Sequence, residues 1–159
     1  MFFAQPVAAF AHLRATALPG AGLIFSCFRA ERENQWAADI AAMTGAAAPT
    51  PRPGDVPPPG PFAFADPDHV RHLLTAAGWR DVACEAVDYP YVAGAGPDPV
   101  GEATAFFRRI GPAARALRET PEAERPALQA RLAAWLEAHR SGGQVSFPAA
   151  AWIVSARGG

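Results

Sequence analysis

The stretch LPGAGLIFSCF, residues 18–28, decides the fold because it joins the end of a helix to an uncharged strand. Before it, residues 6–17 repeat apolar side chains at helical spacing, and Pro6 stands at a first-turn position. Proline and glycine then stop that helix. Residues 23–28 are apolar without alternation, which is typical of a strand buried on both faces. We therefore expect a helix followed by a fully buried strand.

Helices and strands continue to alternate after this strand. The clearest helix is 67–77. Asp66 is suited to its N-cap, Pro67 to its first turn and Gly78 to its C-terminal stop. The pattern also predicts helices at 33–43, 99–110, 112–119 and about 120–139, and strands at 80–91 and 149–156. This order favours an α/β layered sheet in a single domain, residues 1–159.

Three local irregularities are expected within these elements. In strand 80–91 the apolar residues change face, which predicts a β-bulge near Ala86. Pro126 lies inside the helix expected after Thr120, so we expect a kink or a later helix start. Residues 45–61 are rich in proline and glycine, which favours a long extended connector rather than a domain boundary.

The amino-acid composition excludes several classes of protein. Half of the residues are hydrophobic and 18% are charged, which supports a packed core. The net charge is −1, all 14 basic residues are Arg, and no nucleic-acid partner is indicated. No apolar run approaches the roughly 20 residues of a membrane span. Cys27 and Cys84 lie in apolar runs without a disulfide framework, so we expect a cytoplasmic protein.

The order of elements and several local phrases resemble the C-terminal half of class I S-adenosylmethionine-dependent methyltransferases. Residues 1–6 resemble the segment after strand four of that family. The phrase Leu18-Pro19-Gly20-Ala21-Gly22 resembles its Leu-x-Pro-Gly-Gly lead into strand five, with Ala21 in place of the usual Gly. Residues 64–79 resemble the helix before strand six.

This resemblance implies a partial Rossmann-like methyltransferase sheet with flanking helices. Residues 23–28 would be strand five, residues 80–91 strand six, and residues 149–156 an antiparallel strand seven lying between them. A helical insert, about 97–140, precedes the last strand. The family's cofactor is S-adenosyl-L-methionine, and its substrates here are expected to be small molecules.

The sequence does not carry the family's cofactor-binding motifs, which are a Gly-rich turn after strand one and an acidic residue ending strand two. Gly20-Ala21-Gly22 follows a helix, which is the wrong order. Gly94-Ala95-Gly96 has Pro99 where a third glycine would stand, so we interpret it as a flexible connector. We expect the chain to lack the N-terminal half of the enzyme and to bind S-adenosyl-L-methionine weakly or not at all.

Candidate site residues follow from the resemblance and from the expected strand ends, outside which open α/β sheets bind ligands. The resemblance places Phe2 and Phe3 near the methionine end of the cofactor. The candidates for a substrate pocket are Phe28, Arg29, Trp36, Phe64, Tyr91 and Phe106. Core packing is the alternative for each aromatic residue, whereas Arg29 is hard to bury without a partner. Methyl transfer needs mainly proximity and a dry pocket, so no catalytic residue is assigned.

Other chemistry is not favoured. His69 and His72 could form a metal pair, but they lie beside charged residues on the polar side of a helix, so we expect a solvated face and no metal. The favoured function is a truncated methyltransferase that is inactive as this chain. The alternative is a non-catalytic binding or assembly module that retains the same sheet. Without strand four, strand 23–28 becomes an open edge, through which we expect self-association.

Overall fold

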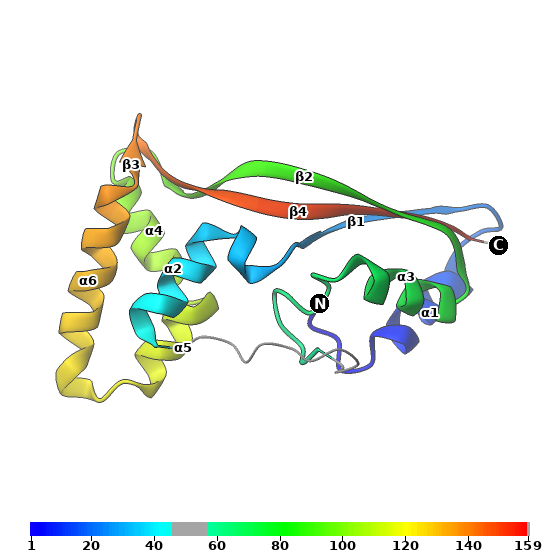
Figure 1. Ribbon diagram of the computed structural model, residues 1–159, viewed down its shortest axis with the longest axis horizontal. Helices are drawn as coiled ribbons and strands as arrows, with labels where there is room; N and C mark the ends of the chain where they lie inside the picture. The colour runs from blue at the N-terminus through cyan, green and yellow to red at the C-terminus, as the bar shows by residue number, and fades with distance from the viewer. Residues whose placement is uncertain (46–56, 159) are drawn as a thin grey trace. The chain divides into compact units, whose positions relative to one another are not determined.

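The computed structural model describes residues 1–45 and 57–158. The protein is a mixed α/β structure with an open, antiparallel four-stranded sheet and flanking helices. Strand β4 (Gln144–Gly158) lies between β1 (Gly22–Phe28) and β2 (Trp79–Ala95), and the short β3 (Arg140–Ser141) pairs with β4 (Figure 1). The last strand therefore lies between the two earlier ones, as expected.

The chain forms two compact units. The first contains helices α1 (Pro6–Thr16) and α3 (Pro67–Ala76), strand β1, and parts of β2 and β4. The second contains the remaining helices, β3, and the other parts of β2 and β4. Strand β2 passes from the first unit to the second after Asp88, and β4 returns to the first at Ala150.

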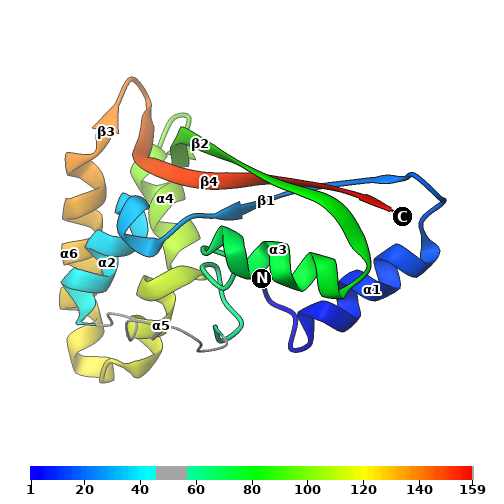
Figure 2. The same ribbon diagram turned by 45° about the vertical axis from the view of Figure 1, so that its right-hand side comes forward.

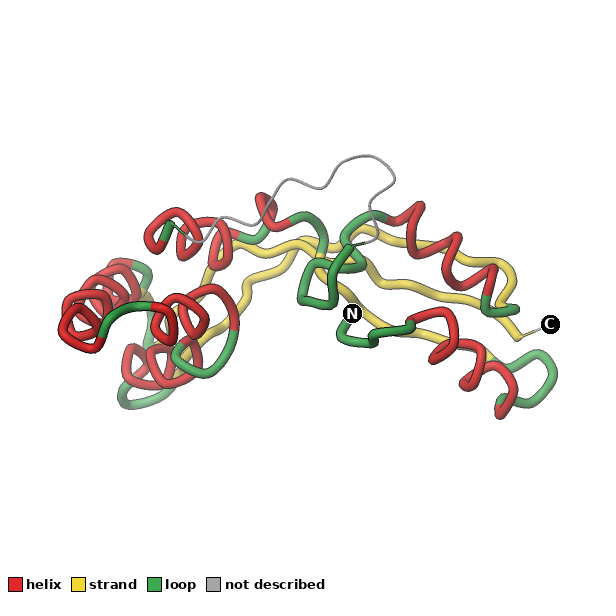
Figure 3. The backbone as a smooth tube through the Cα atoms, turned by 90° about the horizontal axis from the view of Figure 1, so that it is seen from below, coloured by secondary structure: helices red, strands yellow, loops and turns green. Residues whose placement is uncertain are grey.

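Helices α1 and α3 lie on the same face of the strands of the first unit and contact each other (Figures 2 and 3). Both begin where the sequence predicts. The side chain of Asp66 accepts a hydrogen bond of 2.9 Å from the N–H of Asp68, and Gly78 has a φ of +87° at the end of α3. The core of this unit consists of Phe10, Cys27, Ala63, Phe64, Val70, Leu73, Leu74, Ala77, Trp79, Val154 and Ala156.

Strand β1 differs from the prediction of burial on both faces. Its residues alternate, with Phe25 and Cys27 packed against the core while Ile24 is 74% exposed. The reason is that, among the described elements, α1 and α3 cover only one face of this strand. An uncharged apolar run is therefore not sufficient to predict burial on both sides.

Strand β2 is longer than predicted and extends through Ala95. Its partly buried residues alternate up to Cys84, two exposed residues follow at Glu85 and Ala86, and the alternation resumes in the opposite phase at Val87. This confirms the predicted change of face near Ala86. Cys27 and Cys84 are both free, on strands that lie on either side of β4.

The second unit is mainly helical. Helix α2 (Gln35–Thr44) packs against α5 (Gly111–Glu119), and α4 (Pro99–Phe107) packs against α6 (Arg125–Ala138). Two short 3-10 helices, η1 (Glu31–Glu33) and η2 (Glu122–Glu124), precede α2 and α6. Pro126 lies in the first turn of α6, so the predicted later start is confirmed.

Two sequence predictions about this unit need correction. The helix predicted at 99–110 ends at Phe107, so Ile110 follows the end of α4 and is 44% exposed. The last strand begins at Gln144 rather than 149, because Gly142 and Gly143 both adopt positive φ and form a tight turn from β3 into β4.

The predicted connector 45–61 falls mostly outside the described residues. No described helix has the length and apolar character needed to cross a membrane.

Candidate ligand cavity

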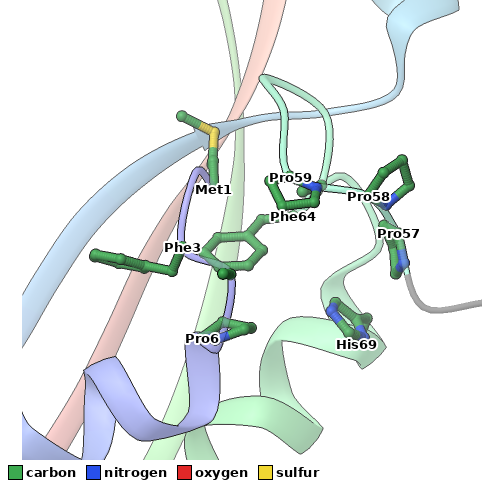
Figure 4. Close-up of a pocket in the computed structure, with 10 residues that line it drawn as sticks. Met1, Phe3, Pro6, Pro57, Pro58, Pro59, Phe64 and His69 are labelled. Atoms are coloured by element: carbon green, nitrogen blue, oxygen red, sulfur yellow. The ribbon is translucent and has the colours of Figure 1, made fainter.

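A cavity of about 270 Å³ lies in the first unit, between the start of the chain and the segment that leads into α3 (Figure 4). Helix α1 leads directly into β1 and packs against it, so the start of α1 lies near the end of β1. The cavity is thus near the carboxyl end of β1. Its lining residues are Met1, Phe3, Ala4, Pro6, Pro57, Pro58, Pro59, Ala63, Phe64 and His69.

The inner wall is formed by Phe64, which is 4% exposed. Its ring lies 6.1 Å from that of Phe10 and 6.4 Å from that of Phe25. Its carbonyl accepts a hydrogen bond of 3.5 Å from the Cys27 thiol. These contacts hold Phe64 in place, so this wall is preformed. Burial, together with a smaller effect of Cys84, raises the pKa of Cys27 to about 11, and the thiol therefore stays protonated at neutral pH.

Two chain segments far apart in sequence are joined at the cavity. The N–H of Gly60 donates a hydrogen bond of 3.1 Å to the carbonyl of Met1. Phe3 packs edge-on against Phe10, with ring centroids 6.0 Å apart. One backbone hydrogen bond therefore joins the segments before α1 and α3 at the cavity.

His69 is the one lining residue, among those that the structure describes, with an ionisable side chain. It lies in the first turns of α3, and its ring is 6.4 Å from that of Phe64. The expected solvated face is correct for His72, which is exposed, and wrong for His69, which is half-buried. His69 precedes Leu73 by four residues and so flanks the buried stripe of α3, a signal that the sequence contains. No group of metal-ligating side chains occurs among the described residues.

The predicted site residues divide between the two units. Phe3 and Phe64 both line the cavity. Phe2 is 69% exposed and is not among the lining residues. Phe28 packs against Phe62, with ring centroids 5.8 Å apart, outside the lining. Of the residues predicted to bind cofactor or substrate, the structure therefore places two in one cavity.

Arg29 has the partner that its burial requires. Its Nη1 lies 2.9 Å from Oδ1 of Asp88, and its guanidinium lies over the ring of Trp152 at 5.3 Å from the centroid. The side chain of Arg29 is 21% exposed and that of Asp88 is 84% exposed. This pair holds the end of β1 against the neighbouring strands and does not line the cavity.

Trp36, Tyr91 and Phe106 lie in the second unit, where they pack together. The Trp36 ring stacks on Tyr91 at 5.3 Å, and Tyr91 lies 6.1 Å from Phe106. Trp36 is only 2% exposed. Burial, with a smaller effect of Tyr89, raises the pKa of Tyr91 to about 12. Trp36 is therefore a core residue, whereas Tyr91 and Phe106 are half-buried beside it.

The Gly94-Ala95-Gly96 segment is not a flexible connector, as the sequence suggested. Gly94 lies within β2, and a Cβ atom there would clash with the carbonyl oxygen of Pro99 and lie 2.7 Å from the nitrogen of Ala103. Glycine is therefore required because α4 approaches the strand closely. Helix α4 begins directly after this segment. Its N-cap is Asp98, whose side chain accepts a 2.9 Å hydrogen bond from the N–H of Gly101.

The sequence matches no protein-family model, and it matches no curated protein.

Proposed function

We propose that this chain is the C-terminal part of a class I S-adenosylmethionine-dependent methyltransferase that acts on a small molecule. The observation that carries the proposal is the position of β4. It is antiparallel, lies between β1 and β2, and follows the helices α4, α5 and α6 in sequence. This is the arrangement that the resemblance requires of strands five, seven and six.

Two further features support the proposal. Helices α1 and α3, which flank β1 in sequence, lie on one face of the sheet. The cavity lies at the carboxyl end of β1, where a ligand is expected in an open α/β fold. Phe3, which the resemblance places near the cofactor, is among the cavity residues.

The described residues do not by themselves fit the whole cofactor. Their cavity is largely apolar, and no carboxylate among its described lining residues could hold ribose hydroxyl groups. At about 270 Å³ it is also below the range of about 300–1,000 Å³ that is usual for larger ligands. We therefore assign activity to a longer polypeptide and derive no transfer step from this chain.

Calorimetric titration with S-adenosylmethionine tests the proposal. The chain of 159 residues should show little or no binding. A chain extended by the in-frame upstream sequence should contain a Gly-rich turn and an acidic strand end, and should bind with a Kd of about 1 µM or tighter. Upstream sequence without these features, or an extended chain that does not bind, would contradict the proposal. Micromolar binding by the present chain would contradict the inference that its cofactor-binding half is missing.

A non-catalytic assembly module is the second candidate function. It is favoured by one observation, the uncharged β1 edge with its exposed Ile24, which presents backbone groups suited to pairing with another strand. Failure of an extended chain to bind S-adenosylmethionine, together with stable self-association, would favour this candidate.

A further inference from the structure

We propose that the cavity at the start of α3 binds a small, uncharged, single-ring aromatic molecule that carries a hydroxyl or N–H group, with His69 as its hydrogen-bond partner. If the bound molecule is the methyl acceptor, this inference rests on the proposed function. The binding site itself is inferred from the cavity alone.

The size of the cavity favours a single ring. At about 270 Å³ it exceeds an engineered cavity of about 150 Å³ that accommodates benzene. It is smaller than the pockets of about 300–1,000 Å³ that enclose drug-sized ligands. A substituted benzene therefore fits, whereas a nucleotide does not.

The lining favours an uncharged aromatic molecule. Two phenylalanine rings, those of Phe3 and Phe64, and four prolines surround the space. No Arg, Asp or Glu side chain is among the described lining residues, and most of the lining is apolar, which favours an uncharged ligand over a charged one. Aromatic ligands can instead pack edge-on or offset against the two rings.

His69 supplies the polar contact. The neutral imidazole has one donor and one acceptor nitrogen, so it can accept from a hydroxyl or N–H group of the ligand. Figure 4 shows the His69 side chain at one end of the cavity, across from Phe3. An apolar pocket with a single well-placed polar group is the usual design of a small-molecule site.

Two of the lining side chains are held in place before any ligand arrives. Phe64 is fixed by Phe10, Phe25 and the Cys27 thiol, and His69 stands on a helix whose first turn is capped by Asp66. These two side chains therefore lose little conformational entropy when a ligand binds.

Fluorine NMR of the purified chain tests the proposal with two probes, 4-fluorophenol and fluorobenzene. Both should show saturable binding, with 4-fluorophenol the tighter ligand. His69→Ala should weaken 4-fluorophenol binding by about five-fold, which is the loss expected for one hydrogen bond, and should change fluorobenzene binding by less than about two-fold. His69→Gln, which keeps a hydrogen-bonding group, should restore most of the affinity.

The matched control is His72→Ala, three residues along the same helix, which should leave both affinities unchanged because His72 is exposed. Circular dichroism establishes that each variant is folded. Absence of saturable binding at about 10 mM of either probe would overturn the proposal. Equal losses for both probes in His69→Ala would overturn the role of His69. The NMR assay contains no cofactor. A negative result in it therefore does not bear on the methyltransferase proposal, which the S-adenosylmethionine titration tests separately.

Discussion

Leu74 and His72 lie two residues apart on α3 but in opposite environments, since Leu74 is 0% exposed and His72 faces solvent. Leu74→Ala should lower the free energy of unfolding by roughly 2–5 kcal/mol, because it removes buried methyl groups and leaves a cavity. His72→Ala should change it by less than about 0.5 kcal/mol. Urea denaturation measures both values, and a small effect of Leu74→Ala would mean that the α3 face is not packed as described.

Cys27 predicts how stability depends on alkaline pH. Burial raises the pKa of its thiol from the usual 9.0 to about 11, so the folded state keeps a proton that the unfolded state loses. The contribution of the Cys27 thiol to the free energy of unfolding is fully present below pH 9. It decreases by roughly 2 kcal/mol as the pH rises towards 11, at about 1.4 kcal/mol per pKa unit.

The check is urea denaturation across this pH range for the natural chain and for Cys27→Ala. The variant should lose less stability with rising pH, whatever its stability at pH 7. Cys84→Ala is the control, because Cys84 is only half-buried and should contribute less to the slope. Identical slopes for the natural chain and Cys27→Ala would contradict the burial of the thiol.

At the scale of elements, β1 has one edge that no described strand pairs with. Arg29 donates its N–H to Ala150 at 3.0 Å, and the carbonyl of Ala21 accepts from Gly158 at 2.8 Å. Because hydrogen-bonded pairs alternate in an antiparallel ladder, Ile24 and Ser26 direct their backbone groups away from β4. This edge is uncharged and free of proline, so it lacks the usual devices against strand pairing.

We therefore predict that the purified chain self-associates at tens of micromolar and that Ile24→Lys reduces the association. The Ile24 side chain is 74% exposed, so the new charge can remain in water. Phe25→Lys should instead unfold the chain, since Phe25 packs 5.4 Å from Phe10 in the core. Light scattering gives the association state and circular dichroism the fold. A monodisperse natural chain would contradict the prediction, and His72→Ala serves as the control.

At the scale of the whole molecule, β2 and β4 each contribute residues to both compact units without a break in the strand. We predict that the units unfold together. Leu74→Ala in the first unit and Leu136→Ala in the second, both at positions 0% exposed, should shift the same denaturation transition. Circular dichroism and tryptophan fluorescence should report coincident midpoints. Two separated transitions would show that each unit folds independently.

Much of the local structure could be predicted from the sequence. Asp66, Pro67 and Gly78 mark the ends of α3 because their capping and backbone preferences act over a few residues. The change of face near Ala86 was visible in the spacing of apolar residues. The position of the last strand between the other two was expected from a family resemblance rather than from these local signals.

The tertiary structure decided what the strands and aromatic residues face. Only packing shows that Ile24 is exposed while Phe25 is in the core, because a uniformly apolar run carries no information about which face is covered. For the same reason, the sequence named both Phe64 and Trp36 as pocket candidates, and only the structure places Phe64 at a cavity wall and Trp36 in a packed cluster. Capping and backbone preferences depend on neighbouring residues, so the sequence alone reveals them. Burial and cavities depend on segments that meet only when the chain folds.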